Sequence, residues 1–183
     1  LSAGFIDYHV NGGGAKLFNF EPELNTLQTM VKAHAGFGTT AMVPTLITDS
    51  AEVMAKAAEA VSQAIDASEP GVLGIHFEGP HLSVPKKGVH AESFVRPIGQ
   101  VERKIFKRDD LGIKIVTLPP ENVTDEDIKL LIEHGVKVSI GHSNASYDRA
   151  LEALELGADG FTHLFNAMSP FTSREPGVLG AAL

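Results

Sequence analysis

Residues 136–163 read VKVSIGHSNASYDRALEALELGADGFTH, and this stretch contains a complete strand–helix–strand unit. Residues 136–140 form an apolar run of the kind found in a strand buried on both faces. A helix is predicted after it, with Leu151 on its apolar face, and Gly157 stands where a left-handed residue commonly ends a helix. A second short strand is predicted at residues 160–163.

The same order of helix, glycine and apolar run occurs twice earlier, in residues 24–47 and 124–142, and a further helix is predicted from Ser50 to about Ala67. The six predicted strands lie near residues 5–9, 41–46, 72–78, 113–118, 136–141 and 159–163. Alternating strands and helices favour an α/β fold with a parallel sheet, either open and doubly wound or closed into a barrel. Because a complete (β/α)8 TIM-type barrel has eight strands and about 250 residues, we expect most of such a barrel, without its last strands.

The composition indicates one globular domain with a small-molecule partner. The chain has 183 residues, 43% of them hydrophobic, and a formal charge of −8, which disfavours nucleic acid and anionic membranes as partners. No stretch approaches the ~20 apolar residues that cross a bilayer. No signal peptide is visible, so a cytoplasmic location is expected by default, although the chain opens at Leu1 rather than at Met. Without cysteine, a transition metal has to be held by His, Asp, Glu or water.

Unusual polar residues stand where four of the predicted strands end. These segments are Asp7-Tyr8-His9-Val10-Asn11, His76-Phe77-Glu78-Gly79-Pro80-His81, Gly141-His142-Ser143-Asn144 and Thr162-His163-Leu164-Phe165-Asn166. The carboxyl ends of parallel barrel strands converge on one mouth, where catalytic residues are found. A lone histidine is more often a core or surface residue, but matching positions at four strand ends favour a functional site.

Glu78, His142 and His163 form the predicted metal site. Two imidazoles and one carboxylate suit zinc or a similar divalent ion and leave a position open for water. Such an ion lowers the pKa of a coordinated water and polarises a substrate carbonyl. The alternative interpretation of Glu78 is a salt-bridged carboxylate at the rim. We consider it weaker, because a buried acid without a cation is costly.

Six motifs stand in collinear order along the chain. They are Phe5-Ile6-Asp7-x-His9-x-Asn11-Gly12, His76-x-Glu78-Gly79-Pro80, Lys86-Lys87-Gly88-x-His90, Gly141-His142-Ser143-Asn144-Ala145, Thr162-His163-Leu164-Phe165-Asn166-Ala167-Met168 and Arg174-Glu175-Pro176-Gly177. Together they resemble the motifs of the N-acetylglucosamine-6-phosphate deacetylase family within the amidohydrolase superfamily. The fourth and fifth motifs, as a pair, are fairly specific.

The resemblance assigns expected roles to individual positions. In that family the motif glutamate and the two strand-end histidines bind the metal, which implies Glu78, His142 and His163 here. The implied substrate-binding positions are Val89 through its backbone, His90, Asn166, Ala167 and Arg174. The guanidinium of Arg174 is the expected phosphate ligand, because it can grip a phosphate with two parallel hydrogen bonds.

The first strand departs from the superfamily pattern, in which many relatives have His-x-His and bind two metals. Here His9 is followed by Asn11, and asparagine is a poor transition-metal ligand. We therefore expect one divalent metal per chain, with His9 and Asn11 lining the site or holding a second metal weakly. Zinc is the first expectation, and iron, cobalt and manganese also suit the ligand set. His76 should lie on the same side of its strand as Glu78 and support the site.

The resemblance implies hydrolysis of N-acetylglucosamine 6-phosphate to glucosamine 6-phosphate and acetate, a step of amino-sugar catabolism. This reaction needs a general base, which in the family is a strand-end aspartate. No matching motif follows His163, and Asp159 opens its strand at the opposite end of the barrel. We therefore expect the base beyond Leu183. Residues 1–183 would then be an incomplete catalytic barrel domain, lacking the flanking small β-domain and inactive in isolation. A homodimer or larger homo-oligomer is also implied.

Two other functions stay open. Another amidohydrolase, such as an aminoacylase or a cyclic-amide hydrolase, would share the barrel and the metal but would not need Arg174 or the Asn166-Ala167 pair. A non-catalytic fragment that binds a sugar phosphate would need no metal, and it leaves the metal-type residues unexplained.

Overall fold

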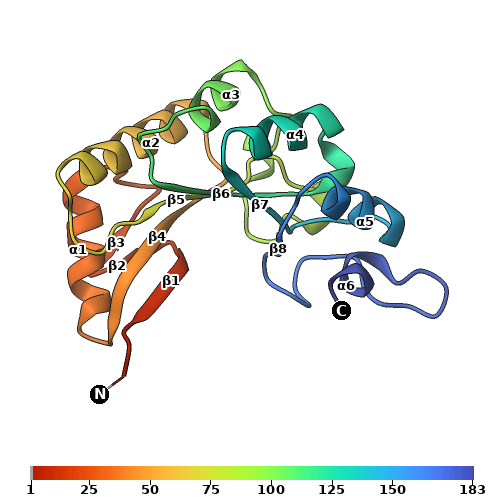
Figure 1. Ribbon diagram of the computed structural model, residues 1–183, viewed down its shortest axis with the longest axis horizontal. Coiled ribbons are helices and arrows are strands. Elements are labelled where there is room, and N and C mark those ends of the chain that lie inside the picture. The colour runs from red at the N-terminus through yellow and green to blue at the C-terminus, as the bar shows by residue number, and fades with distance from the viewer. Residues whose placement is uncertain (1) are drawn as a thin grey trace.

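The computed structural model describes residues 2–183, which form a curved parallel sheet with helices along its outer side (Figure 1). The strands of this sheet are β1 (Phe5–Val10), β4 (Thr39–Ile47), β5 (Gly74–Glu78), β6 (Ile113–Leu118), β7 (Val136–Ile140) and β8 (Gly160–Phe161). They neighbour one another in that order, and every pair is parallel. The six predicted strands are confirmed, and the sheet has the strand–helix order of the predicted barrel.

The helices follow the strands in the predicted alternation. They are α1 (Leu24–Ala35), α2 (Ala51–Asp66), α3 (Gln100–Phe106), α4 (Asp125–Glu133), α5 (Tyr147–Glu155) and α6 (Gly177–Ala182). The short helices α3 and α6 and a small hairpin of β2 (Gly12–Gly13) and β3 (Lys16–Leu17) were not predicted, since they are too short for a periodic pattern. Within residues 2–183, no helix is long and apolar enough to cross a membrane.

Local signals in the sequence explain where the helices begin and end. The hydroxyls of Ser50 and Thr124 accept hydrogen bonds from backbone N–H groups three residues later, which starts α2 and α4 at their predicted positions. Gly157 has the expected left-handed backbone after α5. The glycine break expected at Gly36 and Gly38 after α1 has its left-handed residue at Gly38, with φ 96°, whereas Gly36 has φ −60° and continues the right-handed turn.

Polar side chains on neighbouring strands form a continuous hydrogen-bonded chain across the sheet. His76 Nδ1 lies 3.2 Å from Thr45 Oγ1, and His76 Nε2 lies 2.7 Å from Thr117 Oγ1. The hydroxyls of Thr117 and Ser139 each lie 2.7 Å from Thr162 Oγ1. Four of these five side chains belong to strands β4 to β7, and the fifth, Thr162, directly follows β8. This row of hydrogen bonds therefore ties successive strands together and satisfies the buried imidazole of His76.

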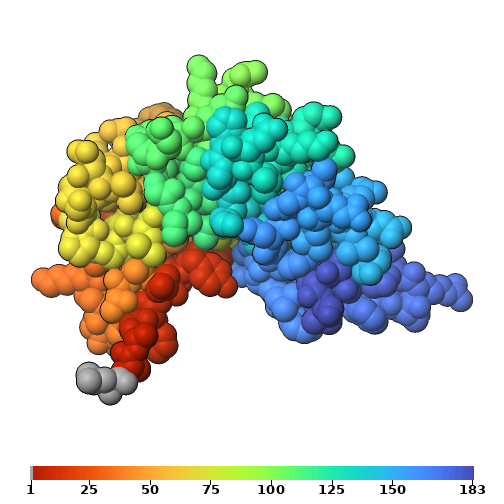
Figure 2. Space-filling model, in the orientation of Figure 1, coloured from red at the N-terminus to blue at the C-terminus, as the bar shows by residue number. Residues whose placement is uncertain are grey.

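A hollow opens between the two ends of the sheet, where the first strand and the C-terminal part of the chain stand apart (Figure 2). This pocket of about 740 Å³ is lined by residues of β1, including Phe5 and Tyr8, and by Phe161 of β8. His9, His76 and His163 also line it, and of these His9 and His163 are partly exposed, whereas His76 is buried.

We predict that Gly74→Ala will weaken the fold strongly. Gly74 pairs with Ile113 across β5 and β6, and a Cβ at this position would lie 1.9 Å from the Ile113 carbonyl oxygen. Because two paired backbones cannot separate without losing ladder hydrogen bonds, the free energy of unfolding should fall by about 3 kcal/mol.

The matched control is Gly135→Ala, because a Cβ on Gly135 meets nothing within 4 Å and bears only the strain of φ 70°. That strain costs about 1 kcal/mol. Urea unfolding of the protein expressed from its complete gene should therefore give a clearly larger loss for Gly74→Ala, and equal losses would contradict the close strand contact.

Candidate metal centre and substrate pocket

Glu78, the last residue of β5, is buried and surrounded by four imidazoles. Strand β5 has a hydrogen-bonded neighbour on each side, which places its whole length in the interior. Glu78 Oε1 lies 2.6 Å from His163 Nε2 and 3.1 Å from His142 Nε2. Glu78 Oε2 lies 3.3 Å from His9 Nε2 and 3.8 Å from His90 Nε2. One carboxylate therefore gathers groups from four separate chain segments.

The two predicted histidine ligands both have an uncommon backbone conformation. His142 has φ 47° and His163 has φ 56°, in the left-handed region that residues with a side chain rarely occupy. Each is the second residue after the end of a strand, β7 or β8, and the backbone turns there. Such strain persists only where the surroundings hold it, and it clusters at functional sites. The turn brings both imidazoles to the same oxygen of Glu78.

Glu78 is negatively charged at neutral pH. Burial opposes ionisation of its carboxyl, but hydrogen bonds with His142, His163 and His9 outweigh it and hold the pKa of Glu78 well below its usual range. The hydrogen bond to Glu78 also raises the pKa of His163, against the lowering effect of burial. Burial lowers the pKa of His90 to about 4 in spite of the nearby carboxylate, so His90 is neutral.

The donor set fits a divalent transition metal. His142 Nδ1 lies 2.8 Å from the carbonyl oxygen of Lys86, which can only accept, so the imidazole carries its proton on Nδ1. In the neutral ring, the lone pair of Nε2 then faces Glu78 Oε1, 3.1 Å away. Two acceptors that face each other repel unless a cation lies between them or the imidazole gains a second proton. A metal-ligating histidine commonly has its other nitrogen fixed by a carbonyl in this way.

The possible metal donors fall into two groups that share Glu78. Within residues 2–183 these groups are His9–Glu78–His163 and Glu78–His90–His142. The predicted trio of Glu78, His142 and His163 is therefore divided between them, with Glu78 in the middle. The expected lining role of His9 agrees with its place beside Glu78. The sequence did not associate His90 with the metal donors, because it lies in a loop well after its strand.

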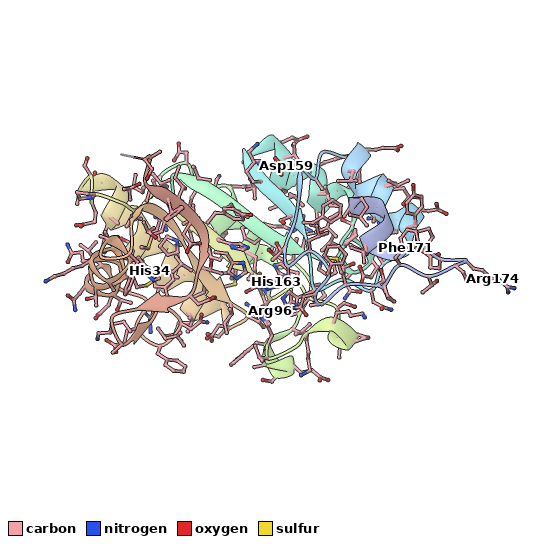
Figure 3. The ribbon with its side chains drawn as sticks, turned by 90° about the horizontal axis from the view of Figure 1, so that it is seen from below. His34, Arg96, Asp159, His163, Phe171 and Arg174 are labelled. Atoms are coloured by element: carbon pink, nitrogen blue, oxygen red, sulfur yellow. The ribbon has the colours of Figure 1, made fainter. Side chains whose placement is uncertain are left out.

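A pocket of about 480 Å³, called the Glu78 pocket below, opens beside this cluster. Its lining residues are His9, Asn11, Ile47, Glu78, Gly88, Val89, His90, His142, His163, Asn166 and Ala167. It thus contains all the predicted site residues except Arg174. Arg174 is exposed and extends from the end of the molecule, away from His163 (Figure 3). Asp159 is also remote from His163 in Figure 3, and it pairs with Lys137 on the surface.

Two further residues hold the loops of the site, and no sequence motif pointed to them. The carboxylate of Glu121 accepts hydrogen bonds from Ser143 Oγ, at 2.7 Å, and from the backbone N–H of Asn144, at 2.6 Å. It thereby fixes the loop that follows His142. Thr48 contacts His90 through both its backbone and its hydroxyl. Such contacts bring together segments far apart in the chain, so spacing along the sequence does not reveal them.

A model of the amidohydrolase family matches residues 1–180. The chain belongs to the amidohydrolase family. That family is metal-dependent, which agrees with the His and Glu groups around Glu78.

Several relatives of this amidohydrolase carry deacetylase names. The chain is 57% identical over 182 residues to N-acetylgalactosamine-6-phosphate deacetylase of Shewanella sp. (strain ANA-3), covering 100% of this chain and 46% of that protein. It is 39% identical over 184 residues to N-acetylglucosamine-6-phosphate deacetylase of Haemophilus influenzae, covering 100% and 48%. The chain thus spans about half the length of the curated relatives it matches.

Solved structures agree with this assignment. The crystal structure of N-acetylglucosamine-6-phosphate deacetylase from Pasteurella multocida matches with a TM-score of 0.94 and 42% identity, over 98% of this chain and 48% of that one. The N-acetyl-D-glucosamine-6-phosphate deacetylase of Mycobacterium smegmatis matches with a TM-score of 0.89 and 32% identity, over 98% and 47%. The curved sheet is therefore part of the barrel fold of these enzymes.

We predict that Glu78→Gln will abolish metal binding. The amide removes the negative charge shared by both donor groups, so divalent metal measured by elemental analysis of the purified protein should fall at least about tenfold. The matched control is Glu102→Gln, which removes another buried carboxylate, one paired with Arg96. That variant should lose stability and keep its metal, whereas retention of metal by Glu78→Gln would contradict the site.

The metal-free protein should depend on pH through His163. The folded-state pKa of His163 is raised, so its pair with Glu78 contributes stability that is complete below the unfolded value of about 6.5 and is lost as pH rises through the raised pKa. The depressed pKa of Glu78 keeps that contribution present above about pH 4.5. His163→Asn should therefore lower the free energy of unfolding more at pH 5.5 than at pH 9, measured after chelation. Equal losses at the two pH values would exclude the charged pair.

Proposed function

We propose that this chain is the metal-binding part of an enzyme that removes the acetyl group from an N-acetylhexosamine 6-phosphate. The observation that carries the proposal is the Glu78 pocket, in which the carboxylate–imidazole cluster and the segments of Val89, His90, Asn166 and Ala167 meet. Its volume of about 480 Å³ lies within the usual range for small-molecule sites. Relatives named for this reaction with glucosamine and galactosamine substrates add support.

Glu78, His142 and His163 are the proposed ligands of one divalent metal, with zinc first and iron, cobalt or manganese as alternatives. When bound, the metal supplies Lewis-acid polarisation of the acetyl carbonyl and makes an attacking water more acidic. Glu78 contributes the negative charge, and the carbonyl of Lys86 keeps the Nε2 lone pair of His142 directed at the site. His9 and Asn11 line the pocket beside them.

The substrate is proposed to lie across the mouth of the Glu78 pocket. Asn166 and Ala167 would bind the sugar phosphate, and Val89 and His90 would contact the N-acetylated sugar. Arg174 is the proposed phosphate ligand on the strength of its motif, although it stands outside this pocket. The general base is proposed to lie outside residues 1–183, which then form part of the catalytic barrel domain. We also propose a homo-oligomer, a dimer or larger.

A second candidate substrate is favoured by one observation. The relative at 57% identity is named for N-acetylgalactosamine 6-phosphate, whereas the Haemophilus influenzae relative at 39% is named for N-acetylglucosamine 6-phosphate. The two sugars differ only in configuration at C4, so both place the acetyl group and the phosphate alike. The reaction type is the same for the two candidate substrates. The candidates differ only in which configuration at C4 of the sugar the enzyme prefers.

The proposal predicts that the protein expressed from its complete gene will release acetate from both hexosamine phosphates. The value of kcat/KM should be at least about 100-fold lower for the unphosphorylated sugars, since charge-assisted contacts to the phosphate are lost. Chelation should abolish turnover and added zinc should restore it. Equal rates with and without the phosphate would favour another amidohydrolase activity. Ligand binding that is indifferent to chelators would favour a non-catalytic role.

A further inference from the structure

Thr48, the residue directly after β4, contacts His90 through two groups. Its backbone N–H donates to His90 Nδ1 across 3.3 Å, and its hydroxyl oxygen lies 2.9 Å from the same nitrogen. Both residues are buried. A third contact joins the Thr48 hydroxyl to the carbonyl oxygen of Glu78, at 3.4 Å.

These contacts fix the tautomer of His90. A backbone N–H can only donate, so His90 Nδ1 has to be the acceptor, and the proton of the neutral ring lies on Nε2. The hydroxyl of Thr48 can donate to the same nitrogen, at a shorter distance than to the carbonyl of Glu78. His90 Nε2, with its proton, then faces the Glu78 carboxylate 3.8 Å away and the pocket.

The neighbouring His142 has the opposite arrangement. Its ring lies 4.5 Å from that of His90, centroid to centroid, but its Nδ1 faces the carbonyl of Lys86 instead of an N–H group. His142 therefore offers a lone pair on Nε2, and His90 offers an N–H. Of the group Glu78–His90–His142, which has suitable spacing for a metal, His90 carries the wrong tautomer for ligation through Nε2.

We propose that Thr48 is a positioning residue that keeps His90 as an N–H donor to the substrate and keeps it from binding the metal. We infer that the Nε2–H of His90 donates to an oxygen of the N-acetylated sugar, and this part of the inference rests on the proposed deacetylase function. The tautomer itself rests on the contacts alone.

Thr48 is itself held in place from two sides. The guanidinium of Arg96 donates to the carbonyl oxygen of the next residue, Asp49, across 2.7 Å and to Glu102 across 2.8 Å. On the other side Gly79 packs so closely that a Cβ there would lie 2.2 Å from Thr48 Oγ1. The N–H of Thr48 therefore has little freedom to turn away from His90.

The test in solution uses Thr48→Val, which keeps the shape and the backbone N–H and removes the hydroxyl. In the protein expressed from its complete gene, kcat should fall by about 10- to 100-fold, the usual cost of losing an orienting contact. KM should stay within about twofold, and metal content should be unchanged. Thr48→Ser, which restores the hydroxyl, should recover kcat to within about threefold of wild type.

The matched control is Thr26→Val. Thr26 is equally buried, lies in α1, and its hydroxyl has no hydrogen-bond partner, so this variant should leave kcat unchanged. An unchanged kcat in Thr48→Val would overturn the positioning role. Loss of metal from Thr48→Val would also overturn it, because His90 would then belong to the metal site.

Nitrogen-15 NMR of the histidine side chains tests the tautomer without any activity measurement. The signals of His90, assigned by their absence in His90→Asn, should show the proton on Nε2 and an unprotonated Nδ1. A proton on Nδ1 would overturn the inference. If the wild-type protein releases no acetate from either hexosamine phosphate, the proposed function fails, and this spectrum still decides whether His90 has the tautomer that its contacts with Thr48 require.

Discussion

A single buried carboxylate, that of Glu78, is the constraint on which the rest of the site depends. Glu78 is only 2% exposed, so its charge has little contact with water and has to be satisfied by neighbouring groups. Four imidazoles meet this need, and two of them, on His142 and His163, reach it only through a strained left-handed backbone. The fold accepts that strain because the alternative, an uncompensated buried charge, costs more.

Main-chain groups decide what each imidazole of the cluster can do. The carbonyl of Lys86 makes His142 a lone-pair donor, and the N–H of Thr48 makes His90 a proton donor, although both rings face the same carboxylate. The Lys86 carbonyl and the ring of His90 both come from the loop that follows Glu78. That loop therefore sets the tautomer of His142 through Lys86, and it also carries His90, whose tautomer is set by Thr48.

The sequence predicted the strands well because strands buried on both faces are apolar runs, and it predicted Glu78, His142 and His163 as neighbours because strand ends of a parallel sheet converge. It could not predict how these residues divide around Glu78, since that depends on backbone turns at the strand ends. The roles of Thr48 and Glu121 were hidden for a similar reason, because their contacts join distant segments. Gly36 shows the same limit on a smaller scale, since a glycine permits a left-handed turn without requiring one.

The shared carboxylate also bears on the number of metals. Both candidate groups use Glu78, and their other donors are imidazoles, which bring no negative charge. One divalent ion already exceeds the single negative charge of Glu78. A second ion would add two positive charges to the same buried cluster with no further acid among its donors, and the repulsion would be large at low dielectric. This electrostatic argument supports the proposal of one metal per chain, with Glu78, His142 and His163 as its ligands.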